Sequence, residues 1–179
     1  MGGKGCRDGV IGPAIELPAD SPLRGLADQP TLVILLRSFG CTFCREAMSD
    51  VAALKQSIGD AGANVAFVHG ASANEAAPWF TKYGLDGVIA VSDPQLSHYR
   101  AFGLGRTGVQ ALVDPKVWTR GAVCALSHGF GGQTPEMMRQ LPGVFVVQRG
   151  RVLAEYRHSS PADRPDYLAL IRSASLGVQ

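Results

Sequence analysis

Two cysteines, Cys41 and Cys44, separate an apolar run from a helix-like run, and this junction constrains the fold more than any other feature. The run TLVILL (residues 31–36) is short, uninterrupted and rich in branched residues, which predicts a strand buried on both faces. In EAMSDVAALKQSIG (46–59) apolar residues recur at spacings of three and four, which predicts an amphipathic helix. The chain must therefore carry the cysteine pair where a central strand turns into a helix.

The rest of the chain continues the alternation of strands and helices and then changes it. The sequence predicts strands at 64–69 and 88–93, helices at 72–84, 94–103 and 163–175, and an antiparallel hairpin at 142–158 around a Gln-Arg-Gly turn. Residues 104–135 carry no clear pattern. This order predicts an α/β fold with a mixed central sheet, helices on both faces, and a C-terminal hairpin followed by a helix.

Composition limits the classes of protein to consider. A chain of 179 residues with 46% apolar and 18% charged residues suits one globular domain, which we expect at 23–179 after a Gly- and Pro-rich extension at 1–22. A net charge of +2 without a basic cluster gives no reason to expect nucleic acid. No apolar run approaches the roughly 18 residues of a membrane span, and no signal peptide is evident, so we expect a cytoplasmic protein.

Redox chemistry is the first interpretation of the pair. In a reducing compartment, two cysteines this close are more often catalytic or metal-binding than structural. Cys41 is expected at the helix N-terminus, where free amides and the helix dipole favour a thiolate, with Arg45 and Arg37 adding positive charge. Cysteines in such settings have pKa values of about 3.5 to 7.5. The spacing also lets Cys41 and Cys44 form a disulfide.

Two other interpretations of the pair stay open: a metal site, and a scaffold that has lost its activity. A structural zinc normally needs four ligands in spaced pairs, and no metal is expected here because the histidines are scattered. Those histidines are His69, His98, His128 and His158. Cys124 has a possible role in resolving an oxidised pair, but a small buried residue is the simpler interpretation. Cys6 falls in the extension.

Particular motifs resemble a known fold and family. The stretch Cys41-Thr42-Phe43-Cys44 resembles the active-site motif of the thioredoxin fold, and the segment from Pro142 to Gly150 resembles that fold's proline-strand-turn segment. The blocks FGCTFCREA, SDPQLSHYRAFGL, LPGVFVV and YRHSSPADRPDY are together similar to the peroxiredoxin-like branch of the alkyl hydroperoxide reductase/thiol-specific antioxidant family. Relatives in that branch include prostamide/prostaglandin F synthases.

The resemblance implies a thioredoxin-like fold and a thiol-dependent antioxidant oxidoreductase. Cys41 would attack a peroxide or a disulfide and Cys44 would resolve the product to a disulfide. Arg45 and Thr42 would support the thiolate. The resemblance also implies a cis Leu141–Pro142 bond that packs against the pair. An external thiol donor, such as a thioredoxin or glutathione system, would restore the dithiol, with no bound cofactor.

The sequence also departs from the peroxiredoxin pattern PxxxTxxC. With Cys41 as the attacking residue, Ser38 takes the Thr position but Ile34 replaces the Pro. The other register favours Cys44 as the attacking residue, so the two roles remain interchangeable. Two alternatives follow: a protein-disulfide or prostaglandin-endoperoxide reductase, and a non-catalytic module that binds thiols or a metal.

Overall fold

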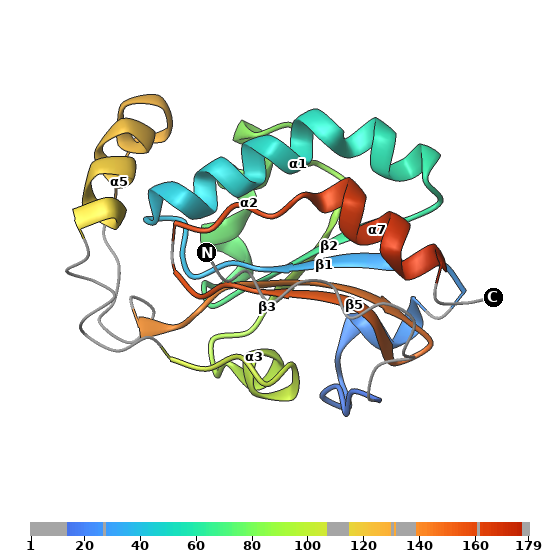
Figure 1. Cartoon of the computed structure of the whole chain (residues 1–179). Helices are drawn as coiled ribbons and strands as arrows, with labels where there is room; N and C mark the ends of the chain where they lie inside the picture. The colour runs from blue at the N-terminus through green and yellow to red at the C-terminus, as the bar shows by residue number, and fades with distance from the viewer. Residues whose placement is uncertain are drawn as a thin grey trace.

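The structure is a computed structural model of the whole chain, and it describes residues 14–26, 28–106, 115–129, 131, 139–160 and 162–176. Its centre is a five-stranded sheet in the order β3-β2-β1-β4-β5 (Figure 1). The strands are β1 (Thr31–Leu35), β2 (Asn64–His69), β3 (Ile89–Ser92), β4 (Gly143–Gln148) and β5 (Arg151–Arg157). β1 pairs in parallel with β2 and antiparallel with β4. The predicted mixed sheet is confirmed.

Helices cover both faces of the sheet, as predicted (Figure 1). On one face lie α1 (Thr42–Asp60), α2 (Ala73–Lys82) and α7 (Tyr167–Leu176); on the other lie α3 (Ser97–Ala101) and the 3₁₀ turn η1 (Pro22–Gly25). Alternate residues of β1 feed the two cores: Leu32 and Ile34 face α1, while Val33 and Leu35 face α3. Every residue of β1 is therefore buried, which explains its uninterrupted apolar sequence.

The hairpin and two helices refine the predicted bounds. β4 and β5 join through Arg149 and Gly150, both with positive φ, as a tight hairpin turn requires. In α2 a capping box joins Ser72 and Glu75, and Pro78 lies in the second turn. Pro78 is tolerated there because it is solvent-exposed, so water can satisfy the carbonyl group that loses its backbone donor.

α3 begins later than predicted. The predicted helix begins at Pro94, but the residues before Ser97 form a turn in which Leu96 adopts a left-handed conformation. The Asp93 carboxylate still accepts hydrogen bonds from the backbone amides of Ser97 and His98. Asp93 thus satisfies the start of the helix from a preceding turn.

Two segments outside the predicted elements also pack on the domain. Ala14 bridges to Arg151 of β5, and Leu17 is buried beside α3, so the described part of the extension lies against the sheet. The unassigned stretch contains α5 (Pro115–His128), which stands beside the first turns of α1 (Figure 1). Among the residues that the structure describes, no helix combines the length and apolar character that crossing a bilayer requires.

Candidate active site

The two cysteines lie at the carboxyl end of β1, on the first turn of α1. Cys41 is the N-cap residue of α1, in an extended conformation, and Cys44 is its third helical residue. The Cys41 amide donates to the Ser38 carbonyl, which closes the turn between strand and helix. The sequence predicted this placement because a buried strand running into a helix leaves little room for any other.

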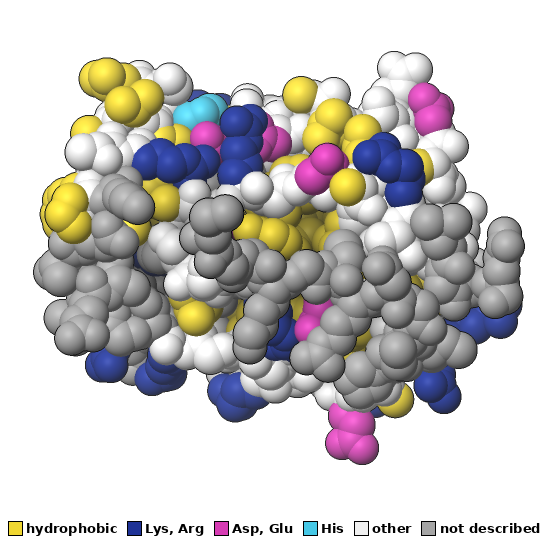
Figure 2. Space-filling model, viewed as in Figure 1, with side chains coloured by type: hydrophobic (Ala, Val, Ile, Leu, Met, Phe, Trp, Pro, Cys, Tyr) yellow, Lys and Arg dark blue, Asp and Glu magenta, His cyan; other side chains and the backbone are white. Residues whose placement is uncertain are grey.

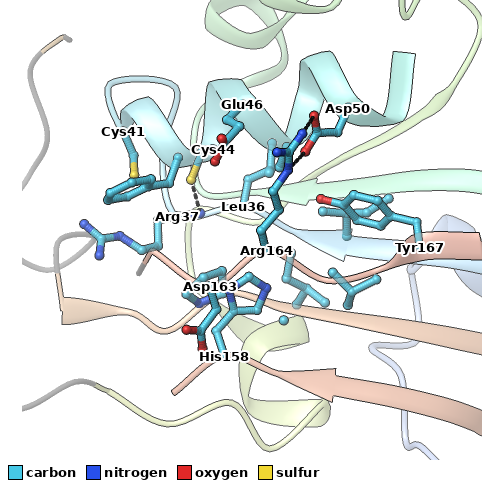
Figure 3. A pocket seen from close by; sticks show the side chains of 17 residues that line it. Leu36, Arg37, Cys41, Cys44, Glu46, Asp50, His158, Asp163, Arg164 and Tyr167 are labelled. Atoms are coloured by element: carbon cyan, nitrogen blue, oxygen red, sulfur yellow. Dashed lines mark hydrogen bonds and ion pairs between the residues drawn. The ribbon is translucent and has the colours of Figure 1, made fainter. Parts of the chain in front are cut away.

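A small pocket opens beside the pair, between α1, the start of β4 and the segment that leads into α7 (Figure 3). Its floor is apolar, with Leu36, Pro142 and Val144, and its rim is polar. The rim and the sulfur-bearing side are formed by Arg37, Cys41, Cys44, Glu46, Asp50, His158, Asp163, Arg164 and Tyr167. On this side of the molecule, hydrophobic atoms lie between groups of charged side chains (Figure 2). We call this recess the thiol pocket.

Exposure does not distinguish the two cysteines. A cysteine at the end of a helix is expected to be more exposed than one a turn inside it, but only 3% of Cys41 and 4% of Cys44 is accessible. The expectation was wrong because α5 packs against the first turn of α1: the Phe43 ring lies within ordinary van der Waals reach of Gly121, and the Cys124 thiol contacts the Thr42 carbonyl at 3.7 Å. Any difference in reactivity must therefore come from electrostatics.

The surroundings of Cys41 favour its thiolate. The pKa of Cys41 is lowered from 9.0 to about 6, chiefly by a hydrogen bond from the Cys44 thiol. Burial opposes this shift, while the positive charge of Arg37 and the amides of Cys44 and Phe43 add to it. These amides belong to the helix N-terminus, whose positive end stabilises a negative charge. Cys41 is therefore mostly thiolate at neutral pH.

The surroundings of Cys44 keep it protonated. Its pKa is raised well above the ordinary value, first because its thiol donates to Cys41 and then because it is buried next to a negative charge. The Arg37 amide donates to the Cys44 Sγ at 3.2 Å, shown as a dashed line in Figure 3. One cysteine is thus an anionic nucleophile and the other a neutral thiol beside it.

Arg45 is placed differently from what we expected. Its guanidinium donates to the carbonyl groups of Phe39 at 2.6 Å and of His128 at 2.9 Å, and it lies 4.3 Å from the centre of the Trp79 ring. These contacts join the cysteine loop to α2 and to the end of α5. The cation that acts on Cys41 is Arg37, whose side chain lines the thiol pocket.

Ser38 and Thr42 contribute differently from the cysteines. Both hydroxyl groups are buried, and neither has a hydrogen-bond partner among the described residues. The Ser38 carbonyl holds the loop, and the Thr42 carbonyl accepts a contact from the Cys124 thiol at 3.7 Å. Their backbones therefore shape the junction.

The expected cis bond before Pro142 is not present. No cis peptide occurs among the described residues, so Leu141–Pro142 is trans. The trans form is the more stable isomer of such a bond, and here the Leu141 amide donates to the Gly105 carbonyl and Gly143 enters β4 directly. Pro142 nevertheless lines the thiol pocket next to both cysteines.

The far rim of the pocket consists of residues to which the sequence analysis gave no role at the site. Arg164 forms two hydrogen bonds with Asp50, at 2.8 and 2.6 Å, and so joins the segment before α7 to α1 (Figure 3). Burial lowers the pKa of His158 to about 4, so its imidazole is neutral at physiological pH. His158 and Arg164 belong to the block YRHSSPADRPDY, which contributed to the family resemblance. Nothing in the spacing of that block indicated that it faces the cysteines.

The other candidate residues lie apart from this chemistry. Cys124 is buried on α5, as expected of a small core residue, and burial raises its pKa. His69, one of the scattered histidines, is 1% exposed because it ends β2 against Phe39 and Phe80. Cys6 lies outside the described residues. Within those residues, no three His, Cys, Asp or Glu side chains gather as metal ligands would.

Comparisons with known proteins concern the family and the fold of the chain. The sequence model of the AhpC/TSA antioxidant enzymes matches residues 50–160, a stretch that begins after the cysteine pair. No curated protein matches the chain.

Solved structures of peroxiredoxins share the fold. Reduced Prx3 from Vibrio vulnificus is 14% identical, with a TM-score of 0.63 over 94% of this chain and 97% of Prx3. The structure of the same protein in complex with hydrogen peroxide is 16% identical, with a TM-score of 0.60 over 94% of this chain and 97% of that chain. Peroxiredoxin Q from Xanthomonas campestris is 18% identical, with a TM-score of 0.62 over 90% and 95% of the two chains. The central sheet and its helices are thus those of a thioredoxin-like peroxiredoxin fold.

Proposed function

Because the chain belongs to the family of AhpC/TSA antioxidant enzymes, we propose that it is a thiol peroxidase that uses Cys41 and Cys44 as a dithiol. One observation carries the proposal: the pKa of Cys41 is lowered to about 6, next to a protonated Cys44, in a pocket on this fold. The activity requires a cysteine that is ionised at neutral pH, because a thiolate and not a thiol attacks a peroxide.

The first step oxidises Cys41. Its thiolate attacks one oxygen of the hydroperoxide, the O–O bond breaks, and the leaving alkoxide or hydroxide takes a proton from water. Cys41 becomes a sulfenic acid, and the peroxide is reduced to an alcohol or water. Arg37 supports the step by neutralising negative charge beside the sulfur.

The second step forms the disulfide. The Cys44 sulfur attacks the Cys41 sulfenic sulfur, and the hydroxyl group leaves with the Cys44 proton as water. An external dithiol, or two molecules of a monothiol, then returns two electrons and restores both thiols. Because Cys44 is already hydrogen-bonded to Cys41, little movement is needed to bring the two sulfurs together.

The size of the pocket supports a small substrate. Its free volume is about 20 Å³, and roughly 10 to 15 Å³ suffices for one water molecule. Hydrogen peroxide fits such a space without rearrangement, and the Vibrio vulnificus Prx3 structure was determined in complex with it.

The experiment is a titration of fully reduced protein with hydrogen peroxide, followed by intact mass and timed against free cysteine. We expect a loss of two hydrogens, at a rate far above that of free cysteine. Cys44→Ser should instead gain one oxygen, because the sulfenic acid forms but has no partner. Oxidation at the rate of free cysteine would contradict the proposal.

A second candidate, a disulfide reductase, is favoured by the position of both cysteines on the first turn of α1. A thiolate at the helix N-cap followed by a buried thiol suits exchange with an incoming disulfide as well as attack on a peroxide. In that case peroxide would oxidise the protein slowly, whereas an oxidised substrate protein would convert the pair to its disulfide quickly, through a mixed disulfide that Cys44→Ser would trap.

A further inference from the structure

One peptide unit, between Leu36 and Arg37, connects the cysteine pair to the opposite side of the sheet. Its N–H group donates to the Cys44 Sγ at 3.2 Å. Its carbonyl group, on Leu36, accepts a hydrogen bond from the Tyr99 hydroxyl. The two ends of a peptide group point in opposite directions, so Cys44 and Tyr99 hold the same unit from two sides.

Tyr99 is built into the core beneath this peptide. It lies on α3, is 1% exposed, and belongs to the core on the face of the sheet away from α1. Its hydroxyl also lies 3.3 Å from the Val68 carbonyl at the end of β2. The Tyr99 side chain extends from α3 between the ends of β1 and β2, so its hydroxyl lies next to the turn that carries the cysteines.

We propose that Tyr99 is a positioning residue for the cysteine pair, and that its hydroxyl strengthens, through the Leu36–Arg37 peptide, the hydrogen bond donated to Cys44. This inference rests on the proposed function, because it concerns the same two thiols. It assigns a role in the dithiol chemistry to a residue that contacts neither sulfur.

The physical basis is polarisation along a chain of donors. When a carbonyl accepts a hydrogen bond, the N–H of the same peptide becomes a stronger donor, and successive bonds reinforce one another by about 10 to 30% each. The chain runs from the Tyr99 hydroxyl through the peptide to the Cys44 sulfur, whose thiol donates in turn to Cys41. Each donation draws negative charge from the next sulfur and so stabilises the Cys41 thiolate.

A purely structural role would leave a different signature. The Tyr99 hydroxyl also ties the ends of β1 and β2 together, so its removal costs stability whether or not it tunes the thiols. Tuning predicts a change in Cys41 ionisation in addition. The decisive readout is therefore the pH dependence of Cys41, not stability or turnover.

The test is Tyr99→Phe, with the alkylation rate of Cys41 by iodoacetamide measured against pH and assigned by peptide mass. We expect the midpoint to rise by roughly 0.2 to 0.6 pH units, as when a charge-assisted hydrogen bond loses about 10 to 30% of its strength. A fluorotyrosine in place of Tyr99, whose more acidic hydroxyl is a stronger donor, should lower the midpoint. This second variant keeps the hydroxyl and guards against misfolding of the first.

The control is Phe102→Leu, a core change on the same face, at a residue whose ring packs against Phe145 and forms none of the hydrogen bonds in the chain of donors. It should cost stability and leave the midpoint unchanged. Equal midpoints in wild type, Tyr99→Phe and the fluorotyrosine protein would overturn the inference. Alkylation needs no peroxide and no donor, so a wild-type protein without peroxidase activity would refute the proposed function while this test still decided the role of Tyr99.

Discussion

The thiol pocket can be compared with a second buried polar cluster, formed by Ser21, Asp93 and His98, on the opposite face of the sheet. In the second cluster the Ser21 Oγ lies 2.8 Å from the His98 Nε2, and the His98 Nδ1 lies 3.2 Å from the Asp93 carboxylate. These are the residue types of a nucleophile, a base and an orienting acid. Residue types alone would therefore suggest chemistry at both places.

The contacts of the two clusters differ. In the Ser21 cluster the oxygen atoms are taken up by structure: Ser21 accepts from the Leu23 amide, and Asp93 accepts from two amides of α3. The His98 Nδ1 lies close to Asp93 but makes no aligned hydrogen bond with it. Ser21, Asp93 and His98 are at most 6% exposed, and none of them lines the thiol pocket. The cluster fastens the segment before η1 to α3.

The comparison teaches what a site adds to reactive residues. Cys41 and Cys44 are as buried as the Ser21 cluster, but they line a pocket and have unequal pKa values. A charged Arg37 and a helix N-terminus create that inequality. Reactive groups that have unequal pKa values and line a pocket indicate chemistry. The Ser21 cluster does not line the thiol pocket, and although burial acts to raise the pKa of Asp93 and hydrogen bonds from Ser97 and His98 lower it, these bonds hold the start of α3.

The largest expected effect separates the two cysteines from each other. Cys41→Ser should abolish fast oxidation by hydrogen peroxide, because no other described cysteine has a lowered pKa. Cys44→Ser should keep the fast first step and lose the disulfide. Stopped-flow consumption of peroxide measures the first step. If Cys44→Ser lost that step and Cys41→Ser kept it, the roles would be reversed.

Arg37→Met should have the next largest effect, which is on the ionisation of Cys41. Removing the cation should raise the pKa of Cys41 from about 6 by up to about 1 pH unit, which lowers the thiolate fraction at pH 6 up to about fivefold. The alkylation rate of Cys41 measures this. Arg45→Met is the matched control: it removes a cation that holds loops, so it should cost stability and leave the Cys41 midpoint in place.

Ser21→Ala should lower the stability of the protein without changing its chemistry. It removes a partner of His98 and of the Leu23 amide in a buried place, so unfolding by urea should show a loss of about 1 to 3 kcal/mol. The rate of peroxide reduction in the folded protein should not change. A fall in that rate at full stability would show that the second cluster acts in the chemistry.

The smallest expected effect concerns the rim of the pocket. Arg164 is 58% exposed, so its ion pair with Asp50 is screened by water and salt. Arg164→Gln should cost less than about 1 kcal/mol, and less still at high salt. Asp50→Asn is the partner control. A much larger loss would mean that this pair holds the pocket closed.

Much of this account was predictable from sequence, for identifiable reasons. β1 and β2 are buried on both faces, so their apolar runs indicated strands, and the adjacent strand and helix patterns placed Cys41 at the start of α1. The tight turn at Arg149 and Gly150 was recognisable from its residues. These elements are determined by residues that are close together in the sequence, so patterns in the sequence predict them.

The parts that depend on long-range packing were not predictable. α5 leaves Trp118, Val123 and Leu126 exposed, so its pattern does not resemble that of a helix with one buried face, and hydrophobic atoms gather on the surface over it (Figure 2). Which arginine acts on Cys41 depends on side-chain direction, and both Arg37 and Arg45 are near in sequence. Tyr99 and His158 reach the site from distant segments.

The most direct test of the central claim is the pH dependence of alkylation of Cys41 and of Cys44 in the reduced wild-type protein, resolved by peptide mass. The account predicts that Cys41 reacts with a midpoint near pH 6 and that Cys44 stays unreactive until the solution is strongly alkaline. The sign follows from the thiolate being the reactive form, so the rate rises as pH passes the pKa. A Cys41 midpoint near 9.0, the ordinary value, or a faster reaction at Cys44, would contradict it.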